Sequence, residues 1–150
     1  MAITTVKEIM TSVVEVLGIG DTLAAARKQI ARGRIRHLPV VDGSEHLVGL
    51  ITHRRILESW VSHGHPNDES RGEVERDVPV EMVMEKDVLT VDPATAAAEA
   101  ARLLEILKLG CLPVVEHGKL VGIVTEADFV RFARHYFEWE MTSARGGLKT

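Results

Sequence analysis

The chain contains one segment written twice. Three fragments recur in the same order: "VKEIM" (residues 6–10) as "VEMVM" (80–84), "RHLPVVD" (36–42) as "GCLPVVE" (110–116), and "LVGLIT" (47–52) as "LVGIVT" (120–125). The first two pairs share one offset. The third is one residue closer because the intervening turn, where a length change costs least, is shorter in the second copy. The duplication predicts two structural units of the same design.

Each copy has the hydrophobic pattern of a β-α-β-β-α unit. Short apolar runs predict strands, and apolar residues spaced by three and four predict a helix. Thr22 and Thr95 are the expected N-caps of the first helix in each copy. The expected elements are strands at 13–16 and 88–91, helices at 22–32 and 95–108, a hairpin from 38–41 and 47–51, and second helices that begin at Thr52 and Thr125.

One unit of about 55 residues buries too little surface to be comfortably stable alone. We therefore expect an α/β (α+β) fold in which the two β-α-β-β-α repeats pack sheet to sheet with pseudo-two-fold symmetry. The expected parts are repeat 1 (residues 1–61), a polar linker (62–79), repeat 2 with an aromatic C-terminal helix (80–141) and a flexible tail (142–150).

Composition narrows the class of protein. Hydrophobic residues make up 45% of the chain, and the net charge of −4 gives no reason to expect nucleic acid or an anionic membrane as partner. Cys111 is the only cysteine, so no intramolecular disulfide can form. The apolar runs are too short to span a bilayer, and the N-terminus lacks the pattern of a signal peptide. We expect a soluble, cytoplasmic protein.

The repeated pattern resembles the cystathionine-β-synthase (CBS) domain pair, also called a Bateman module. The shared features are V-x-x-x-M at the start of each repeat, L-P-V-V before the hairpin, and G-h-h-T-x-x-D after it, where h is apolar. The resemblance covers residues 6–58 and 80–134. It implies a stand-alone regulatory module that binds adenosine-containing ligands such as AMP, ADP, ATP or S-adenosylmethionine and acts on an unknown partner protein.

The resemblance also implies which residues line two clefts. In each cleft the Thr and Asp of one repeat hold the ribose, and the other repeat supplies contacts to adenine and phosphate. One cleft would join Ile19, Gly20, Ala24, Ile35, Arg36, His37, Leu38, Ile123, Thr125, Ala127 and Asp128. The mirror cleft would join Leu50, Thr52, Arg54, Arg55, Asp92, Pro93, Ala97, Leu109, Gly110, Cys111 and Leu112.

The two clefts differ in charge. Asp128 ends "GIVTEAD", and its carboxylate can accept hydrogen bonds from both ribose hydroxyls, whereas Arg55, which ends "GLITHRR", has no acceptor. Arg36 and His37 can meet phosphates beside Asp128, and the mirror cleft has no cation at the equivalent positions. We predict that a nucleotide binds beside Asp128 and that the Arg55 cleft is empty or binds another anion.

Simpler interpretations of these residues stay open. Thr-x-x-Asp at a helix start also matches a capping box, which would explain Asp128 without a ligand. "HRR" (residues 53–55) is either an anion site or a solvated basic surface, and Cys111 is either a reactive or a buried, inert thiol. "HGH" (residues 63–65) with Asp68 is either a metal site or part of a solvated linker. We expect no metal and no cofactor.

An aromatic stripe marks the last helix. Phe129, Phe132, Tyr136 and Trp139 follow one another at spacings of three and four, and the stripe continues past the end of the repeat. Part of it is expected to pack on the sheet and part to form a homodimer interface.

Three functions compete. The first is a homodimeric nucleotide sensor, the second is a dimeric scaffold or adaptor that binds no nucleotide, and the third is an enzyme. No catalytic triad spacing or phosphate-cradling glycine loop is present, so we expect no enzyme. An open cleft at Asp128 favours the sensor, and bulky side chains that fill it favour the adaptor.

Overall fold

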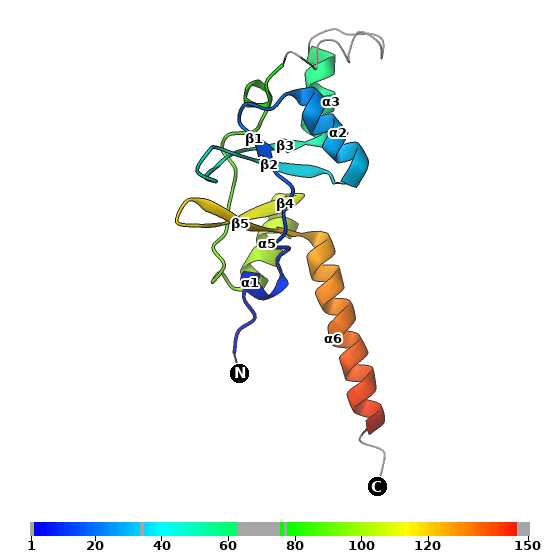
Figure 1. The fold of residues 1–150 in the computed structure, drawn as a ribbon. Coiled ribbons are helices and arrows are strands. Elements are labelled where there is room, and N and C mark those ends of the chain that lie inside the picture. The colour runs from blue at the N-terminus through cyan, green and yellow to red at the C-terminus, as the bar shows by residue number, and fades with distance from the viewer. Residues whose placement is uncertain (1, 34, 63–75, 77, 147–150) are drawn as a thin grey trace.

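The computed structural model describes residues 2–33, 35–62, 76 and 78–146. Figure 1 shows two stacked lobes whose small sheets face each other, with helices on their outer sides. The first lobe contains β1 (Leu17–Gly18), α2 (Leu23–Gly33), β2 (His37–Val41), β3 (Leu47–Thr52) and α3 (His53–Ser62). The second contains α5 (Ala97–Leu107), β4 (Cys111–Glu116), β5 (Lys119–Thr125) and α6 (Glu126–Gly146). The predicted α/β (α+β) fold of two repeats is confirmed.

The two hairpins are built alike. β2 runs antiparallel to β3, and β4 runs antiparallel to β5. Each hairpin shifts register at the same place, between Val40 and Val41 in one and between Val114 and Val115 in the other. Such a bulge increases the local twist of a strand pair, so both repeats have the same curvature at this point.

The first strand of each repeat differs from the prediction. Only β1 pairs with β2, and residues 13–16 form no strand; the side chain of Val13 is 90% exposed. The strand expected at 88–91 is reduced to a single bridge between Val91 and Val114. The apolar run was misleading because a strand also needs a neighbour with free backbone hydrogen-bonding groups.

The V-x-x-x-M segment of each repeat packs in the lobe that the other repeat forms. The short helix α1 (Val6–Ile9) lies beside α5 in the second lobe (Figure 1), where the Val6 N–H donates to the Thr95 carbonyl at 2.8 Å. The 3-10 helix η1 (Val80–Met82) contributes Val80, which is fully buried, to the core of the first lobe. Each repeat therefore completes the core of the other, which ties the lobes together.

Two glycines allow the exchanged methionines to approach the hairpins. A Cβ on Gly49 would lie 2.4 Å from Met84 Sδ, and a Cβ on Gly122 would lie 2.5 Å from Met10 Sδ. The glycine of G-h-h-T and the methionine of V-x-x-x-M are thus two halves of one packing contact, which occurs once in each lobe. This contact explains why both motifs recur in both copies.

The helix starts are only partly as predicted. Thr22 caps α2, because the Ala25 N–H donates to Thr22 Oγ1 at 3.3 Å. Thr95 does not cap α5; its Oγ1 accepts from the Asp92 N–H at 3.1 Å, and α5 begins after Ala96 without a side-chain cap. The Thr95 hydroxyl, which was expected to cap α5, instead accepts a hydrogen bond within the turn that precedes the helix.

The last helix, α6, projects beyond the second lobe (Figure 1). Phe129 packs against the core there, whereas Phe132, Tyr136 and Trp139 are exposed by 43%, 49% and 63%. Residues 142–146, expected in a flexible tail, are helical. Most of the predicted linker lies outside the described residues. Within the described ranges, no helix combines the length and the apolar character needed to cross a bilayer.

Candidate functional site

A cavity of about 630 Å³ opens between the lobes, and we call it the inter-repeat cavity. Its volume lies in the usual range for small-molecule sites. Both repeats contribute to its wall. The lining residues are Thr11, Val13, Val14, Glu15, Ile35, Arg36, His37, Gly110, Ile123, Thr125, Glu126 and Ala127.

The structure brings together six residues expected in the Asp128 cleft: Ile35, Arg36, His37, Ile123, Thr125 and Ala127. The other five, which include Asp128, do not line this cavity. Leu38 is buried in the core of the first lobe and Ile19 packs against that core, while Gly20 and Ala24 lie in the turn and helix that follow β1. Residues 13–15, which were expected in the first strand, line the cavity instead, and β1 begins only at Leu17.

Asp128 is buried, with only 3% of its surface exposed, and its carboxylate is occupied by the chain itself. Oδ2 accepts from the Thr125 N–H at 2.8 Å and from Thr125 Oγ1 at 3.3 Å. Oδ1 accepts from Thr11 Oγ1 at 2.8 Å and from the Arg131 guanidinium. Because a carboxylate has about four lone-pair sites, these four donors saturate it.

Asp128 therefore acts as the capping residue of α6. Its bond to the Thr125 N–H satisfies a backbone donor that the helix leaves without a partner. Asp128 is also absent from the lining of the inter-repeat cavity, where the exposed carboxylates belong to Glu15 and Glu126. The capping interpretation thus describes the observed contacts of Asp128, and a ribose would have to displace Thr11 or Arg131 from Oδ1.

Arg55, the pseudo-equivalent of Asp128, has a structural role of another kind. Its N–H donates to Thr52 Oγ1 at 3.0 Å, so Thr52 caps α3 as expected. Its Nε donates to the carbonyl of Val83 at 3.0 Å, which connects α3 to the exchanged segment after η1. Asp128 and Arg55 therefore each connect the start of a helix to the exchanged segment of the other repeat. The connecting group is the carboxylate of Asp128 in one lobe and the guanidinium of Arg55 in the other.

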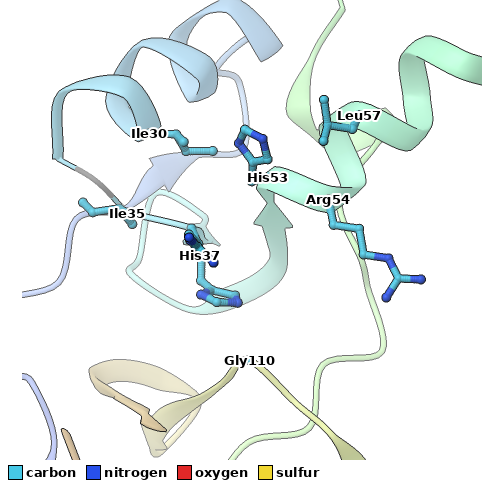
Figure 2. Close-up of a pocket in the computed structure, with 8 residues that line it drawn as sticks. Ile30, Ile35, His37, His53, Arg54, Leu57 and Gly110 are labelled. Atoms are coloured by element: carbon cyan, nitrogen blue, oxygen red, sulfur yellow. The ribbon is translucent and has the colours of Figure 1, made fainter. Parts of the chain in front are cut away.

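A second cavity, of about 830 Å³, lies beside the first lobe, and we call it the basic cavity (Figure 2). Figure 2 shows His53 and Arg54 at the start of α3 on one side and Gly110 on the other, with His37 between them. Its lining residues are Ile30, Ile35, Arg36, His37, His53, Arg54, Leu57 and Gly110. Of the residues expected in the mirror cleft, this cavity includes Arg54 and Gly110.

Arg36 and His37 are not confined to the cavity that contains Thr125 and Ala127. Both residues line both cavities, together with Ile35 and Gly110. The reason is the glycine: a Cβ on Gly110 would lie 2.2 Å from His37 Nε2, so the imidazole occupies the space that a side chain would fill. Burial, with a smaller contribution from the Arg36 charge, lowers the pKa of His37 below 6.5.

Other residues expected in the mirror cleft have local roles. Asp92 Oδ1 accepts from the Ala94 N–H at 2.8 Å within a turn. Cys111 is buried between the lobes with Leu50 and Ile123. Burial, with a smaller contribution from Glu85, raises the pKa of Cys111 to about 12, which makes it an inert thiol at neutral pH.

Sequence reasoning missed Thr11, Glu15 and Glu126, and it considered His53 only within the "HRR" segment. Thr11 directly follows a V-x-x-x-M motif, and Glu126 and His53 directly follow the Thr of G-h-h-T, so adjacency to a repeated motif was an available signal. The "HGH" segment and Asp68 lie outside the described residues. Among the residues that are described, no group of three or more His, Cys, Asp or Glu side chains could hold a metal ion.

Comparison with known proteins places the chain in a family. The CBS domain model matches residues 6–62 and 77–135. AcuB of Vibrio cholerae is 30% identical, with a TM-score of 0.80 over 94% of this chain and 98% of that one. CBSX2, solved in complex with AMP, is 28% identical, with a TM-score of 0.73 over 88% and 97%. The CBS domain pair of MJ0100, solved with 5′-methylthioadenosine and S-adenosyl-L-methionine, is 25% identical, with a TM-score of 0.74 over 90% and 99%. The chain therefore belongs to the CBS domain family and contains two copies of the domain.

Proposed function

We propose that this protein is a non-catalytic regulatory module that binds an adenine nucleotide in the inter-repeat cavity and signals to a partner protein. The observation that carries the proposal is a cavity of about 630 Å³ whose wall combines residues from both repeats. Binding there changes how the lobes are held together, which a partner can sense. CBSX2 with AMP and MJ0100 with S-adenosyl-L-methionine support this class of ligand.

The chemistry of the wall suits a nucleotide. Val13, Val14 and Ile123 offer apolar surface to a base. Glu15 and Glu126 offer carboxylates that can accept from an exocyclic amine or from ribose hydroxyls. The guanidinium of Arg36, also in the wall, can pair with phosphate in a bidentate manner. A cytoplasmic location belongs to the same proposal, since the unpaired Cys111 suits a reducing compartment.

The module is also proposed to be a homodimer through α6. Phe132, Tyr136 and Trp139 lie on one face of the helix and are each at least 43% exposed. Exposed aromatic side chains in a row are typical anchors of protein interfaces. The occupant that we propose for this face is α6 of a second copy, which would bury the aromatic side chains of both protomers.

A thermal-shift panel with AMP, ADP, ATP and S-adenosylmethionine tests ligand binding. A ligand at a hundred times its Kd adds about 2.7 kcal/mol to the free energy of unfolding. Ala127→Trp fills the inter-repeat cavity from its exposed rim and should abolish the shift. Ala31→Trp, at an exposed position of α2 outside both cavities, should preserve it.

The alternative function is a dimeric CBS scaffold that binds no nucleotide. The saturated carboxylate of Asp128 favours it, because the expected ribose acceptor is already occupied. If no adenosine compound shifts the wild-type protein, the scaffold replaces the sensor. If a shift occurs and survives Ala127→Trp, the inter-repeat cavity is not the binding site.

A further inference from the structure

Met10 fixes α1 and the residues around it to the second lobe, and we call residues 4–11 the α1 segment. A Cβ on Gly122 would lie 2.5 Å from Met10 Sδ and 3.1 Å from Met10 Cγ, so the thioether fills the space beside the glycine. Met10 also packs against the apolar core of this lobe. The next residue, Thr11, exchanges two backbone hydrogen bonds of 2.9 Å with Ile123. The thioether is therefore part of a close apolar contact between the α1 segment and β5.

Among the described methionines, Met10 combines access to solvent with close packing. Met82 and Met141 are 77% and 60% exposed, so they can be oxidised without disturbing a packed contact. Met84, the counterpart of Met10 in the first lobe, is only 6% exposed and is protected by its burial. Met10 is partly exposed. A small oxidant can therefore reach a methionine on whose packing the α1 segment depends.

A peroxide converts such a thioether into a sulfoxide. A lone pair of Sδ attacks one oxygen of hydrogen peroxide and the O–O bond breaks. The proton of the attacked oxygen passes to the departing hydroxide, which leaves as water; the sulfur is oxidised and the peroxide is reduced. The new oxygen needs a hydrogen-bond donor, but the N–H groups of Met10, Thr11 and Ile123 already donate to carbonyl oxygens. An unpaired polar oxygen against an apolar core destabilises the contact.

We propose that Met10 is a reversible redox modification site, and that its oxidation to methionine sulfoxide releases the α1 segment from the second lobe. The release moves Thr11, whose Oγ1 donates to Asp128 at 2.8 Å. Thr11 and Ile123 also line the inter-repeat cavity, so the modification alters the wall of that cavity. An enzyme of the methionine sulfoxide reductase class reverses the reaction and restores the contact.

Peroxide treatment of the full chain, followed by peptide mapping and amide hydrogen exchange, tests this proposal. The sulfoxide of Met10 should form before that of Met84, because Met84 is buried. Amide exchange in residues 6–11 should become at least about tenfold faster, since an unpaired polar group weakens a packed contact by at least this factor. Treatment with a methionine sulfoxide reductase should restore the original exchange rates.

Three variants isolate the role of the sulfur. Met10→Leu keeps an apolar side chain of similar volume and has no sulfur, so peroxide should leave its exchange rates unchanged. Met10→Gln introduces a polar side chain and should exchange rapidly without peroxide. The matched control is Met82→Leu/Met141→Leu, which removes the two exposed methionines and should respond to peroxide as the wild type does.

Three results would overturn the proposal. They are oxidation of Met10 no faster than that of Met84, a sulfoxide at Met10 that leaves exchange in residues 6–11 unchanged, and a peroxide response that persists in Met10→Leu. Should Met10→Leu fail to fold, the response of Met82→Leu/Met141→Leu decides, because peptide mapping then assigns it to Met10 or to another methionine. All of these measurements use the free chain, so they are independent of nucleotide binding.

Discussion

The imidazole of His37 lies over Gly110, and both residues line the two cavities. Its pKa is lowered, and we therefore expect the proposed nucleotide binding to depend on pH. A phosphate beside the ring favours the imidazolium and raises the pKa again, so binding takes up a proton. Affinity should increase as the pH falls from 7.5 toward 6, measured by calorimetry, and His37→Gln should flatten this dependence. A steep dependence that persists in His37→Gln would assign the proton to another group.

The same residue links stability to pH in the absence of ligand. The pKa of His37 in the folded chain lies below its unfolded value of 6.5, so the unfolded chain binds more protons between the two values. The free energy of unfolding should therefore fall as the pH drops below about 6.5. Urea titrations of wild type and His37→Gln across this range measure the contribution.

Asp128→Ala should destabilise the fold even without ligand. The substitution leaves the Thr125 N–H and the Thr11 hydroxyl without their acceptor, which costs about 1–3 kcal/mol. Arg55→Ala is the matched variant at the equivalent position; there Thr52 still caps the helix, so the loss should stay below about 1 kcal/mol. Chemical denaturation of both proteins measures the difference. Equal losses would show that Asp128 is not the more important contact.

Gly122→Ala should destabilise the second lobe. The added Cβ would lie 2.5 Å from Met10 Sδ and 3.0 Å from the Thr11 carbonyl oxygen, which belongs to the backbone and cannot swing away. Overpacking of this kind costs about 1–3 kcal/mol. Gly20→Ala is the control, since nothing lies within 4 Å of its added Cβ, and it should change stability by less than about 0.5 kcal/mol. Similar melting curves for the two variants would contradict the exchange of methionines between lobes.

Cys111 should resist thiol reagents in the folded protein. With a pKa of about 12, almost none of the thiol is ionised at pH 8, and burial also blocks access. Its reaction with a disulfide reagent should be about a thousandfold slower than in urea-unfolded protein. A fast reaction under native conditions would mean that the interface between the lobes opens readily.

The exposed face of α6 predicts an oligomeric state. Light scattering after size exclusion should give a dimer, and Tyr136→Ala with Trp139→Ala should weaken it at least about thirtyfold, as expected for interface hot spots. Phe137→Ala is the control, because Phe137 is 59% exposed but lies on another face of the same helix. A monomeric wild type, or an equal effect of Phe137→Ala, would contradict the proposed pair.

The duplicated sequence made the fold predictable. The site was predictable only in part, because it departs from the repeated pattern at particular residues. The duplicated G-h-h-T and L-P-V-V motifs mark hairpins, whose register depends mainly on neighbouring residues. The first strands were placed wrongly because their pairing depends on residues far away in the chain. Gly110 was interpreted as a lack of charge in the mirror cleft, whereas its missing side chain brings His37 into both cavities. Sequence could not show that the single side chain of His37 lines both cavities.

Asp128 illustrates the other difficulty. Its position in Thr-x-x-Asp is compatible with a ribose contact and with a cap, and only three-dimensional contacts distinguish the two. Thr11 and Arg131, which saturate Oδ1, come from the exchanged segment and from the next turn of α6. The exchange of α1 between lobes, which brings Thr11 to Asp128, has no local signal in the sequence.

Photolabelling with 8-azido-ATP, followed by peptide mapping, tests the central claim that an adenine nucleotide binds between the repeats. Labelling should be suppressed by excess ATP and should map to residues 11–15 or 123–127, two segments that contribute to the wall of the inter-repeat cavity. Labelling that ATP does not suppress, or that maps only to other parts of the chain, would contradict the claim.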